Sequence, residues 1–208
     1  MSAVLAEFHR GAADGPAVLV IHSWWGLTGS FHRYARVLAE GGCHVGLVDL
    51  YGGITAATPA EAEALRKAPR RVPLYRRLLA GLESLASQTG RSRLAVAGFS
   101  MGGHWAVWLS QNAGAQIDAV ILYYAARGGD LGRSQARYLA HFAGTDPWVS
   151  ASARRGMERA LARNVLPYQG HDYPGTGHWF AESSSEAFDA SAAGLAVHRD
   201  LRFLGSNR

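Results

Sequence analysis

One serine stands between two glycines in the stretch Gly-Phe-Ser-Met-Gly, where Gly98 and Gly102 flank Ser100. A serine in Gly-x-Ser-x-Gly spacing can act as a nucleophile when a sharp strand-to-helix turn presents its hydroxyl group. Side chains two residues before and two residues after the serine would collide in such a turn, so both positions need glycine. The spacing alone is a weak signal, because an ordinary turn can also contain a serine.

A nucleophilic serine needs a histidine as base and a carboxylate that orients the histidine. Asp146 follows an apolar stretch, and His178 lies in a glycine-rich segment before the last helical pattern. The order serine, carboxylate, histidine is the order in which a strand–turn–helix nucleophile finds its partners on an α/β sheet. Asp172 is a rival acid, but it lies six residues before His178 and would have to fold back on its neighbour. We therefore predict Ser100, Asp146 and His178 as catalytic residues.

Negative charge on a substrate carbonyl oxygen must be stabilised by backbone N–H donors. The N–H of Met101, directly after the serine, is one candidate, and the N–H of Trp24, after the first predicted strand, is the other. Tryptophans next to the candidate segments favour an apolar, aromatic-lined substrate pocket. They are Trp24, Trp25, Trp148 and Trp179.

Strand-like and helix-like segments alternate along the chain and must position these residues. Apolar, strand-like stretches occupy 17–23, 44–51, 93–100, 118–126 and 137–146. Helical patterns occupy 30–42, 58–68, 73–90, 101–114, 149–164 and 185–205. This alternation with short connections predicts an α/β fold with a mostly parallel central sheet and helices on both faces. Ser100 then lies where a buried strand ends and a helix begins.

Composition narrows the class of protein. The 208 residues predict a single domain over 1–208, and 48% hydrophobic with 18% charged residues is typical of a soluble globular protein. Cys43 is the only cysteine, and neither a signal-peptide pattern nor an apolar run of membrane-spanning length is present, so we expect a cytoplasmic protein. The net charge is +5, and we interpret the main basic stretch as a solvated face, because it matches no nucleic-acid-binding motif. That stretch contains Arg66, Lys67, Arg70, Arg71, Arg76 and Arg77.

Several segments, in order, resemble the dienelactone hydrolase family of the α/β-hydrolase fold over residues 15–204. His-Ser-Trp-Trp-Gly-Leu at 22–27 resembles the Glu-x-aromatic-Gly-Leu segment of that family, and Asp-Leu-Tyr at 49–51 resembles its segment after the second strand. Gly-Phe-Ser-Met-Gly-Gly at 98–103 resembles its nucleophile turn, and Asp146 and His178 fall at its acid and base positions. The resemblance implies the fold and a hydrolase activity on esters or lactones. No cofactor is implied, and no group of His, Cys, Asp or Glu has the spacing expected of a metal site.

Three positions depart from the family pattern. The founding members have a cysteine nucleophile and a first-loop glutamate that interacts with the thiol, where this chain has Ser100 and Ser23. The two changes are consistent, because a serine activated by histidine needs no carboxylate to control a thiol. The family's arginine for a substrate carboxylate, four residues after the histidine, is replaced by Glu182. We expect Ser23 and Glu182 to line the pocket, and Glu182 to repel an anionic substrate.

Together these features predict a serine hydrolase that cleaves small carboxylic esters through an acyl-enzyme intermediate, with no nucleic-acid or membrane partner. Hydrolysis of a lactone or thioester is an alternative that the sequence does not separate from ester hydrolysis. A non-catalytic binding protein on the same fold is an alternative of another class. The three candidate catalytic residues argue against it, because a scaffold has no need of all three.

Overall fold

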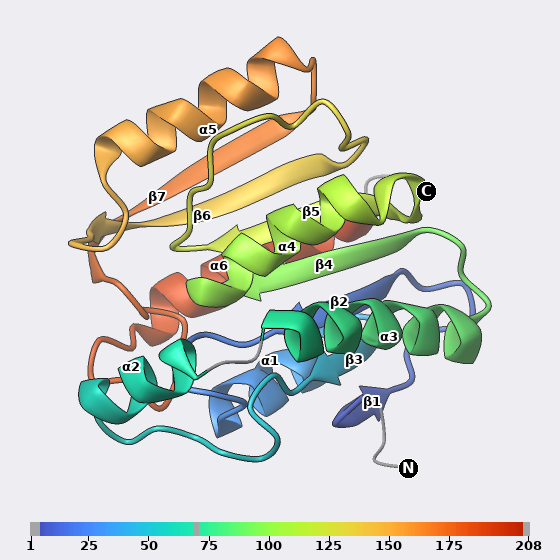
Figure 1. The fold of residues 1–208 in the computed structure, drawn as a ribbon, viewed down its shortest axis with the longest axis horizontal. Helices are drawn as coiled ribbons and strands as arrows, with labels where there is room; N and C mark the ends of the chain where they lie inside the picture. The colour runs from blue at the N-terminus through green and yellow to red at the C-terminus, as the bar shows by residue number, and fades with distance from the viewer. Residues whose placement is uncertain (1–4, 69–70, 206–208) are drawn as a thin grey trace.

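The computed structural model describes residues 5–68 and 71–205. Its strands form a seven-stranded sheet in the order β1-β3-β2-β4-β5-β6-β7 (Figure 1). Strand β1 is antiparallel to β3, and every other neighbouring pair is parallel. The strands are β1 (Glu7–His9), β2 (Ala17–Ile21), β3 (His44–Val48), β4 (Leu94–Phe99), β5 (Ile117–Tyr123), β6 (Arg137–Thr145) and β7 (Tyr168–Gly177).

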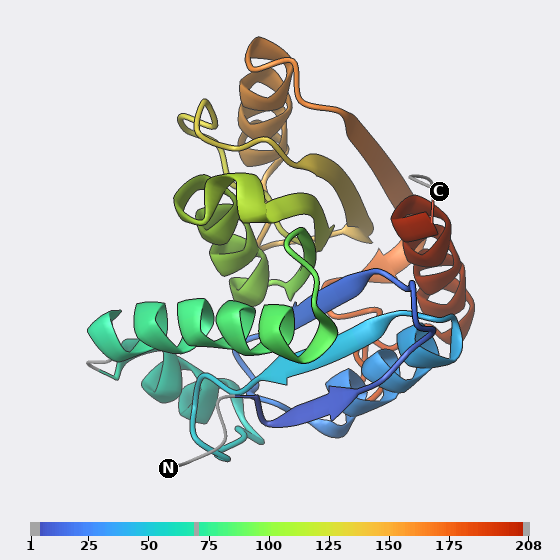
Figure 2. The ribbon, with the colours of Figure 1, turned by 90° about the vertical axis from the view of Figure 1, so that its right-hand side faces the viewer.

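Helices cover both faces of the sheet: α3, α4 and α5 lie on one face, and α1 and α6 on the other (Figure 2). The helices are α1 (Gly29–Glu40), α2 (Pro59–Lys67), α3 (Arg71–Thr89), α4 (Met101–Asn112), the 3-10 helix η1 (Gly114–Gln116), α5 (Ala151–Arg163) and α6 (Ala190–Gly205). The arrangement confirms the predicted α/β class with a mostly parallel sheet between two helical layers.

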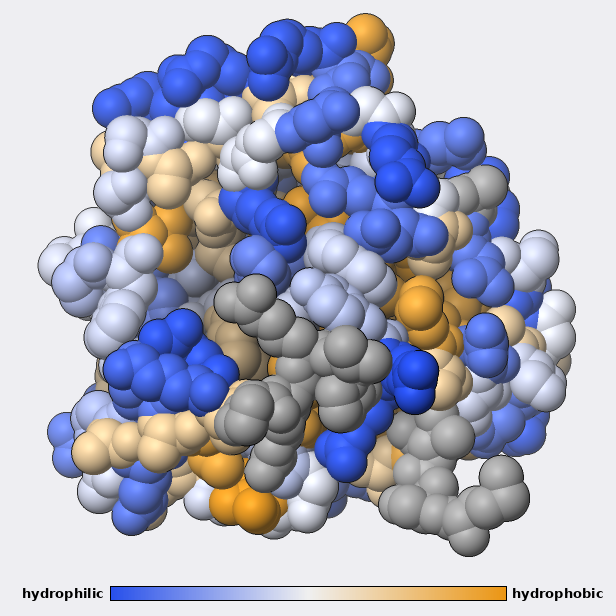
Figure 3. Space-filling view, in the orientation of Figure 1, coloured by the Kyte–Doolittle hydropathy of each residue, from blue (hydrophilic) through white to orange (hydrophobic). Residues whose placement is uncertain are grey.

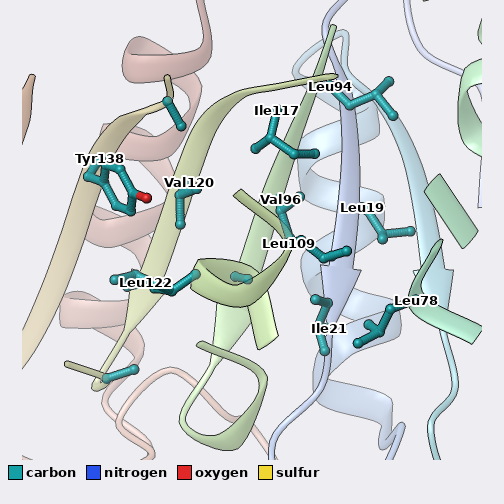
Figure 4. Packing of buried hydrophobic residues seen from close by; sticks show 14 of the residues in the cluster. Leu19, Ile21, Leu78, Leu94, Val96, Leu109, Ile117, Val120, Leu122 and Tyr138 are labelled. Atoms are coloured by element: carbon teal, nitrogen blue, oxygen red, sulfur yellow. The ribbon is translucent and has the colours of Figure 1, made fainter. Parts of the chain in front are cut away.

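Successive side chains of each buried strand point to opposite faces of the sheet and so form two hydrophobic clusters. In β2, Leu19 and Ile21 point to the face covered by α3 and α4, where they pack with Leu78 and its neighbours (Figure 4). Val18 and Val20 point to the other face and pack in the cluster that contains α1 and α6. All five residues of β2 are buried, as expected for a parallel strand covered on both sides. The central strands are therefore packed on both faces, and the segments that carry the candidate residues begin at the ends of these strands.

Two strands were not predicted. Strand β7 contains three glycines and a proline, residues that are depleted in strands. It pairs only with β6, at the edge of the sheet, where such residues are tolerated. Strand β1 has only three residues, too few to show alternation. The last helix begins at Ala190 rather than at 185.

The surface is hydrophilic over much of the view in Figure 3, including the upper edge formed by α5. In the basic stretch, Arg66 and Lys67 form ion pairs with Glu63 at 2.7 and 3.0 Å, whereas Arg70 lies outside the described residues. Of the helices that the structure describes, none has the length and apolar character needed to cross a bilayer.

Candidate active site

Ser100 occupies the turn between β4 and α4 in a conformation that few non-glycine residues adopt. Its φ is 51° and its ψ is −110°, and its N–H donates to the carbonyl oxygen of Tyr123 at 2.9 Å. A Cβ atom on Gly98 would lie 2.3 Å from the carbonyl oxygen of Gly102, and a Cβ on Gly102 would lie 2.3 Å from that of Ile21. The backbones are too close for a side chain at either position. The spacing of the motif therefore reflects a strained turn, as the sequence predicts.

Ser100, His178 and Asp146 form one hydrogen-bonded chain. The Oγ of Ser100 lies 2.9 Å from Nε2 of His178, and Nδ1 of His178 lies 2.8 Å from Oδ2 of Asp146. The three residues directly follow β4, β7 and β6, whose carboxyl ends meet at one edge of the sheet (Figure 1). The side chains of His178 and Asp146 are only 4% and 7% exposed. The parallel sheet thus brings together three residues that lie far apart in sequence.

Asp146 is held in place independently of the histidine. Its Oδ1 accepts hydrogen bonds from the backbone N–H groups of Trp148 and Val149, at 2.8 and 3.0 Å, which leaves Oδ2 for His178. Asp172 lies on β7 with its side chain 56% exposed and pairs with Arg154. Asp146, and not Asp172, is therefore the carboxylate that contacts the histidine.

Two backbone N–H groups near Ser100 have no acceptor among the described residues: those of Met101 and Trp24. Met101 is the first residue of α4, where backbone N–H groups have no partner within the helix. The carbonyl group of Ser23, in the same peptide unit as the Trp24 N–H, accepts from Nδ1 of His22 at 2.6 Å. Nε2 of His22 accepts from the N–H of Leu50 at 3.0 Å, and burial lowers the pKa of this histidine, so its ring is neutral.

The four tryptophans singled out in the sequence form one cluster beside His178. Trp24 stacks on Trp179 with ring centres 5.9 Å apart, and Trp25 and Trp148 each contact both of these rings. The Trp179 ring lies 4.8 Å from the His178 ring. Trp148 is 58% exposed and forms the solvent side of the cluster. An aromatic surface therefore adjoins the candidate base.

The model of the dienelactone hydrolase family matches residues 1–207. The chain belongs to this family. It is 25% identical, over 209 residues, to the carboxymethylenebutenolidase of Pseudomonas putida, an alignment that covers 92% of this chain and 86% of that protein. The chain is a hydrolase of the class that acts on esters and lactones.

Solved structures show the same fold. One is a dienelactone hydrolase-like promiscuous phosphotriesterase from metagenomic libraries, with a TM-score of 0.81, 21% identity, and coverage of 96% of this chain and 90% of that chain. Another is a metagenome-derived lipolytic enzyme, with a TM-score of 0.71, 17% identity and 96% coverage of both chains. The α/β-hydrolase fold that the resemblance implies is thereby confirmed.

The structure corrects the expectation for Glu182. The side chain of this residue, at the position of the family's arginine, is not directed at a substrate: Glu182 is 1% exposed and Ser23 is fully buried. Oε2 of Glu182 accepts from the Ser23 hydroxyl at 2.8 Å. The backbone N–H of Glu182 donates to the carbonyl oxygen of Trp179, in a tight turn after His178. The carboxyl group of Glu182 therefore does not line the pocket surface, and its repulsion of an anionic substrate stays a prediction.

Tyr124, which sequence reasoning missed, completes the surroundings of Glu182. Its hydroxyl donates to Oε1 of Glu182 at 2.8 Å, and its ring lies 4.8 Å from the His178 ring. Burial, together with the negative charge of Glu182, raises the pKa of Tyr124 well above its usual range. Burial also raises the pKa of Glu182 to about 7, although the hydrogen bonds from Ser23 and Tyr124 oppose this shift. The sequence signal that could have indicated Tyr124 is a polar aromatic residue directly after an apolar central strand.

Proposed function

We propose that this chain is a serine hydrolase that cleaves small carboxylic esters through an acyl-enzyme intermediate, with Ser100 as nucleophile, His178 as general base and acid, and Asp146 as the group that orients the histidine. The observation that carries the proposal is the hydrogen-bonded chain from Ser100 Oγ to His178 Nε2, 2.9 Å, and from His178 Nδ1 to Asp146 Oδ2, 2.8 Å. Asp146 accepts from the Nδ1–H group, so the lone pair of Nε2 faces the serine hydroxyl.

The acylation step follows from this arrangement. Ser100 attacks the ester carbonyl carbon while Nε2 of His178 takes the hydroxyl proton. The N–H groups of Met101 and Trp24 donate to the oxyanion, and the first turn of α4 adds the positive end of its dipole. When the tetrahedral intermediate collapses, the C–O bond to the alcohol breaks and His178 gives its proton to the leaving oxygen.

Water then reverses the covalent step. His178 removes a proton from water as the water oxygen attacks the acyl carbon. The bond between this carbon and Oγ of Ser100 then breaks, His178 gives the proton to Oγ, and the carboxylic acid leaves. No cofactor takes part. In a lactone, the leaving oxygen stays attached to the acyl group, so the same residues serve ring opening, and the chain offers no feature that excludes a thioester. The tryptophan cluster supports substrates with an apolar or aromatic acyl or alcohol group.

Turnover of aryl acetates, lactones and thioesters by the wild-type protein and by Ser100→Ala tests the proposal. We expect Ser100→Ala to lose at least about 10³-fold in kcat for every substrate that the wild type cleaves, because the covalent route is removed. The melting temperature is expected to stay unchanged, since only a hydroxyl group is deleted. If Ser100→Ala keeps more than about a tenth of the wild-type rate, another residue is the nucleophile. If the wild type hydrolyses no substrate and is not labelled by a fluorophosphonate, the non-catalytic alternative is favoured.

A further inference from the structure

Three segments around Ser100 meet at one buried carboxyl group. Glu182 belongs to the segment that begins with His178, Ser23 lies between β2 and α1, and Tyr124 directly follows β5. Both oxygens of Glu182 are used, since Oε2 accepts from the Ser23 hydroxyl and Oε1 from the Tyr124 hydroxyl, each at 2.8 Å. One side chain thus joins three segments that the proposed reaction needs in a fixed arrangement.

The contact with Ser23 acts on the proposed oxyanion donor. The carbonyl group of Ser23 and the N–H of Trp24 belong to one planar peptide unit, so the direction of one fixes the direction of the other. His22 holds the carbonyl oxygen at 2.6 Å, and Glu182 holds the Ser23 hydroxyl at 2.8 Å. The Trp24 N–H is therefore aimed by two buried side chains that lie outside the hydrogen-bonded chain of Ser100.

The contact with Tyr124 acts on the proposed base. The Tyr124 ring packs against the His178 ring at 4.8 Å, on an imidazole whose Nδ1 is held by Asp146. Tyr124 has a φ of 39°, in the left-handed region, and its N–H donates to the carbonyl oxygen of His141 at 2.7 Å. Because its hydroxyl is held by Glu182, the ring has little freedom to move away from the histidine.

We propose that Glu182 is a positioning residue, whose ionised carboxylate holds the Trp24 N–H in place through Ser23 and the His178 ring in place through Tyr124. The inference rests on the proposed serine-hydrolase function. Glu182 is 1% exposed and both of its oxygens have protein partners, so it acts through these residues and not on the substrate.

The proposal predicts that the titration of Glu182 contributes to the loss of activity in acid. A carboxylate that accepts two hydrogen bonds must reorganise one of them when it gains a proton, and burial raises the pKa of Glu182 to about 7. On one side of Glu182, its ionisable neighbour is Tyr124, and the Tyr124 ring packs against His178, which contacts Asp146. Behind Ser23 lie neutral His22 and, 3.7 Å from its Nε2, Asp49. Acidification to below about pH 7 therefore disables the positioning residue.

The test compares pH profiles of kcat and KM for an aryl acetate between pH 5 and 9. Glu182→Gln keeps the shape of the side chain but removes its titration and one acceptor oxygen. We expect its plateau kcat to fall about tenfold, because one of two buried donors loses its acceptor. KM is expected to stay within about twofold, and the acid limb of kcat to lose the proton that Glu182 contributes near pH 7. Glu186→Gln, an exposed change in the same segment, is the matched control and is expected to match the wild type.

Several outcomes would decide against the proposal. A wild-type kcat and a wild-type acid limb in Glu182→Gln would overturn it, and so would a change in KM alone, since that would place Glu182 against the substrate. If Glu182→Gln fails to fold, Tyr124→Phe carries the test: it keeps the ring on His178 but removes one donor, and a roughly threefold lower kcat with unchanged KM is expected, whereas an unchanged kcat overturns the proposal. Ser100→Ala is measured alongside. Full activity in Ser100→Ala would overturn the proposed function together with this inference. If Ser100→Ala loses activity and Glu182→Gln keeps the wild-type activity, the inference alone is overturned.

Discussion

Two histidine–carboxylate pairs with the same 2.8 Å hydrogen bond lie in this molecule, one in the candidate active site and one in the core. In the site, Nδ1 of His178 contacts Asp146, and Nε2 faces the hydroxyl of Ser100. In the core, Nε2 of His141 contacts Asp200 on α6, and Nδ1 contacts the hydroxyl of Tyr173 at 2.7 Å. The pairs differ in what the second ring nitrogen meets and in their access to solvent.

The core pair has no room for a substrate. His141 and Asp200 are fully buried, and Asp200 also accepts from the hydroxyls of Tyr34 and Tyr123, at 2.9 and 2.5 Å. These contacts join α6 and α1 to the central strands. The site pair, in contrast, lies at the end of the strands next to exposed Trp148 and a strained serine. The same pair of side chains is thus a structural tie in one place and a candidate catalytic unit in the other, and the surroundings decide which.

Replacing the carboxylate of the site pair should give the largest effect. Asp146→Asn is expected to lower kcat by about 10³- to 10⁴-fold with little change in stability, because the amide no longer holds His178 in the required tautomer. Asp172→Asn is the matched control, since Asp172 pairs with Arg154 on the surface, and a change within about twofold is expected. Steady-state kinetics on one aryl ester measure both variants. A strong loss in Asp172→Asn with a mild one in Asp146→Asn would reverse the assignment of the acid.

The corresponding change in the core pair should affect stability instead. Asp200→Asn leaves His141 and two tyrosine hydroxyls with a poorer acceptor, and loss of a buried paired charge typically costs roughly 3 to 5 kcal/mol. Denaturant unfolding measures this loss, and the folded fraction is expected to keep a kcat within about twofold of the wild type. A stable Asp200→Asn protein without activity would contradict the structural role of the core pair.

Much of this comparison could be predicted from the sequence, but only on one side. The chain order and the strand ends identified Ser100, Asp146 and His178, because a parallel sheet brings the residues after its strands to one edge. His141 and Asp200 lie within a strand and a helix, where no motif marks them. Glu182 was located by its distance from His178, but that spacing does not show whether its side chain turns inward. Its two partners, Ser23 and Tyr124, come from other segments and are visible only in three dimensions.

A third buried carboxyl group sharpens the comparison, because Glu182 has neutral donors where Asp200 has a histidine. Burial raises its pKa from 4.5 to about 7 in the folded protein. The folded state therefore favours the protonated form, so the stabilising contribution is present below pH 4.5 and is lost as the pH rises to about 7. At 1.36 kcal/mol per pKa unit, the loss is roughly 3 kcal/mol.

Glu182→Gln removes this titration. Its free energy of unfolding, measured relative to the wild type by urea denaturation, is expected to rise by an amount of this order between pH 5 and pH 8. Glu186→Gln, which changes an exposed side chain in the same segment, should show no such trend. A difference between Glu182→Gln and the wild type that is constant across this range would show that Glu182 does not titrate as a buried carboxyl group.

The smallest expected effect concerns the exposed side of the site pair. Trp148→Ala removes the most exposed ring of the tryptophan cluster and keeps the backbone N–H that donates to Oδ1 of Asp146. KM for an aryl ester is expected to rise about three- to tenfold, the equivalent of one aromatic contact, with kcat within about twofold. A small alkyl ester is the control substrate, and its KM is expected to rise less than that of the aryl ester. An equal effect on both substrates would place Trp148 outside the substrate pocket.

The central claim is that Ser100 becomes covalently modified during turnover, and the most direct test is to trap it. The wild-type protein is treated with a fluorophosphonate, its mass is measured intact, and the modified peptide is sequenced by mass spectrometry. We predict one adduct per chain, on Ser100, that is absent in Ser100→Ala and present in folded Asp200→Asn. An adduct on another residue, equal labelling of Ser100→Ala, or no adduct on a protein that hydrolyses esters would contradict the account.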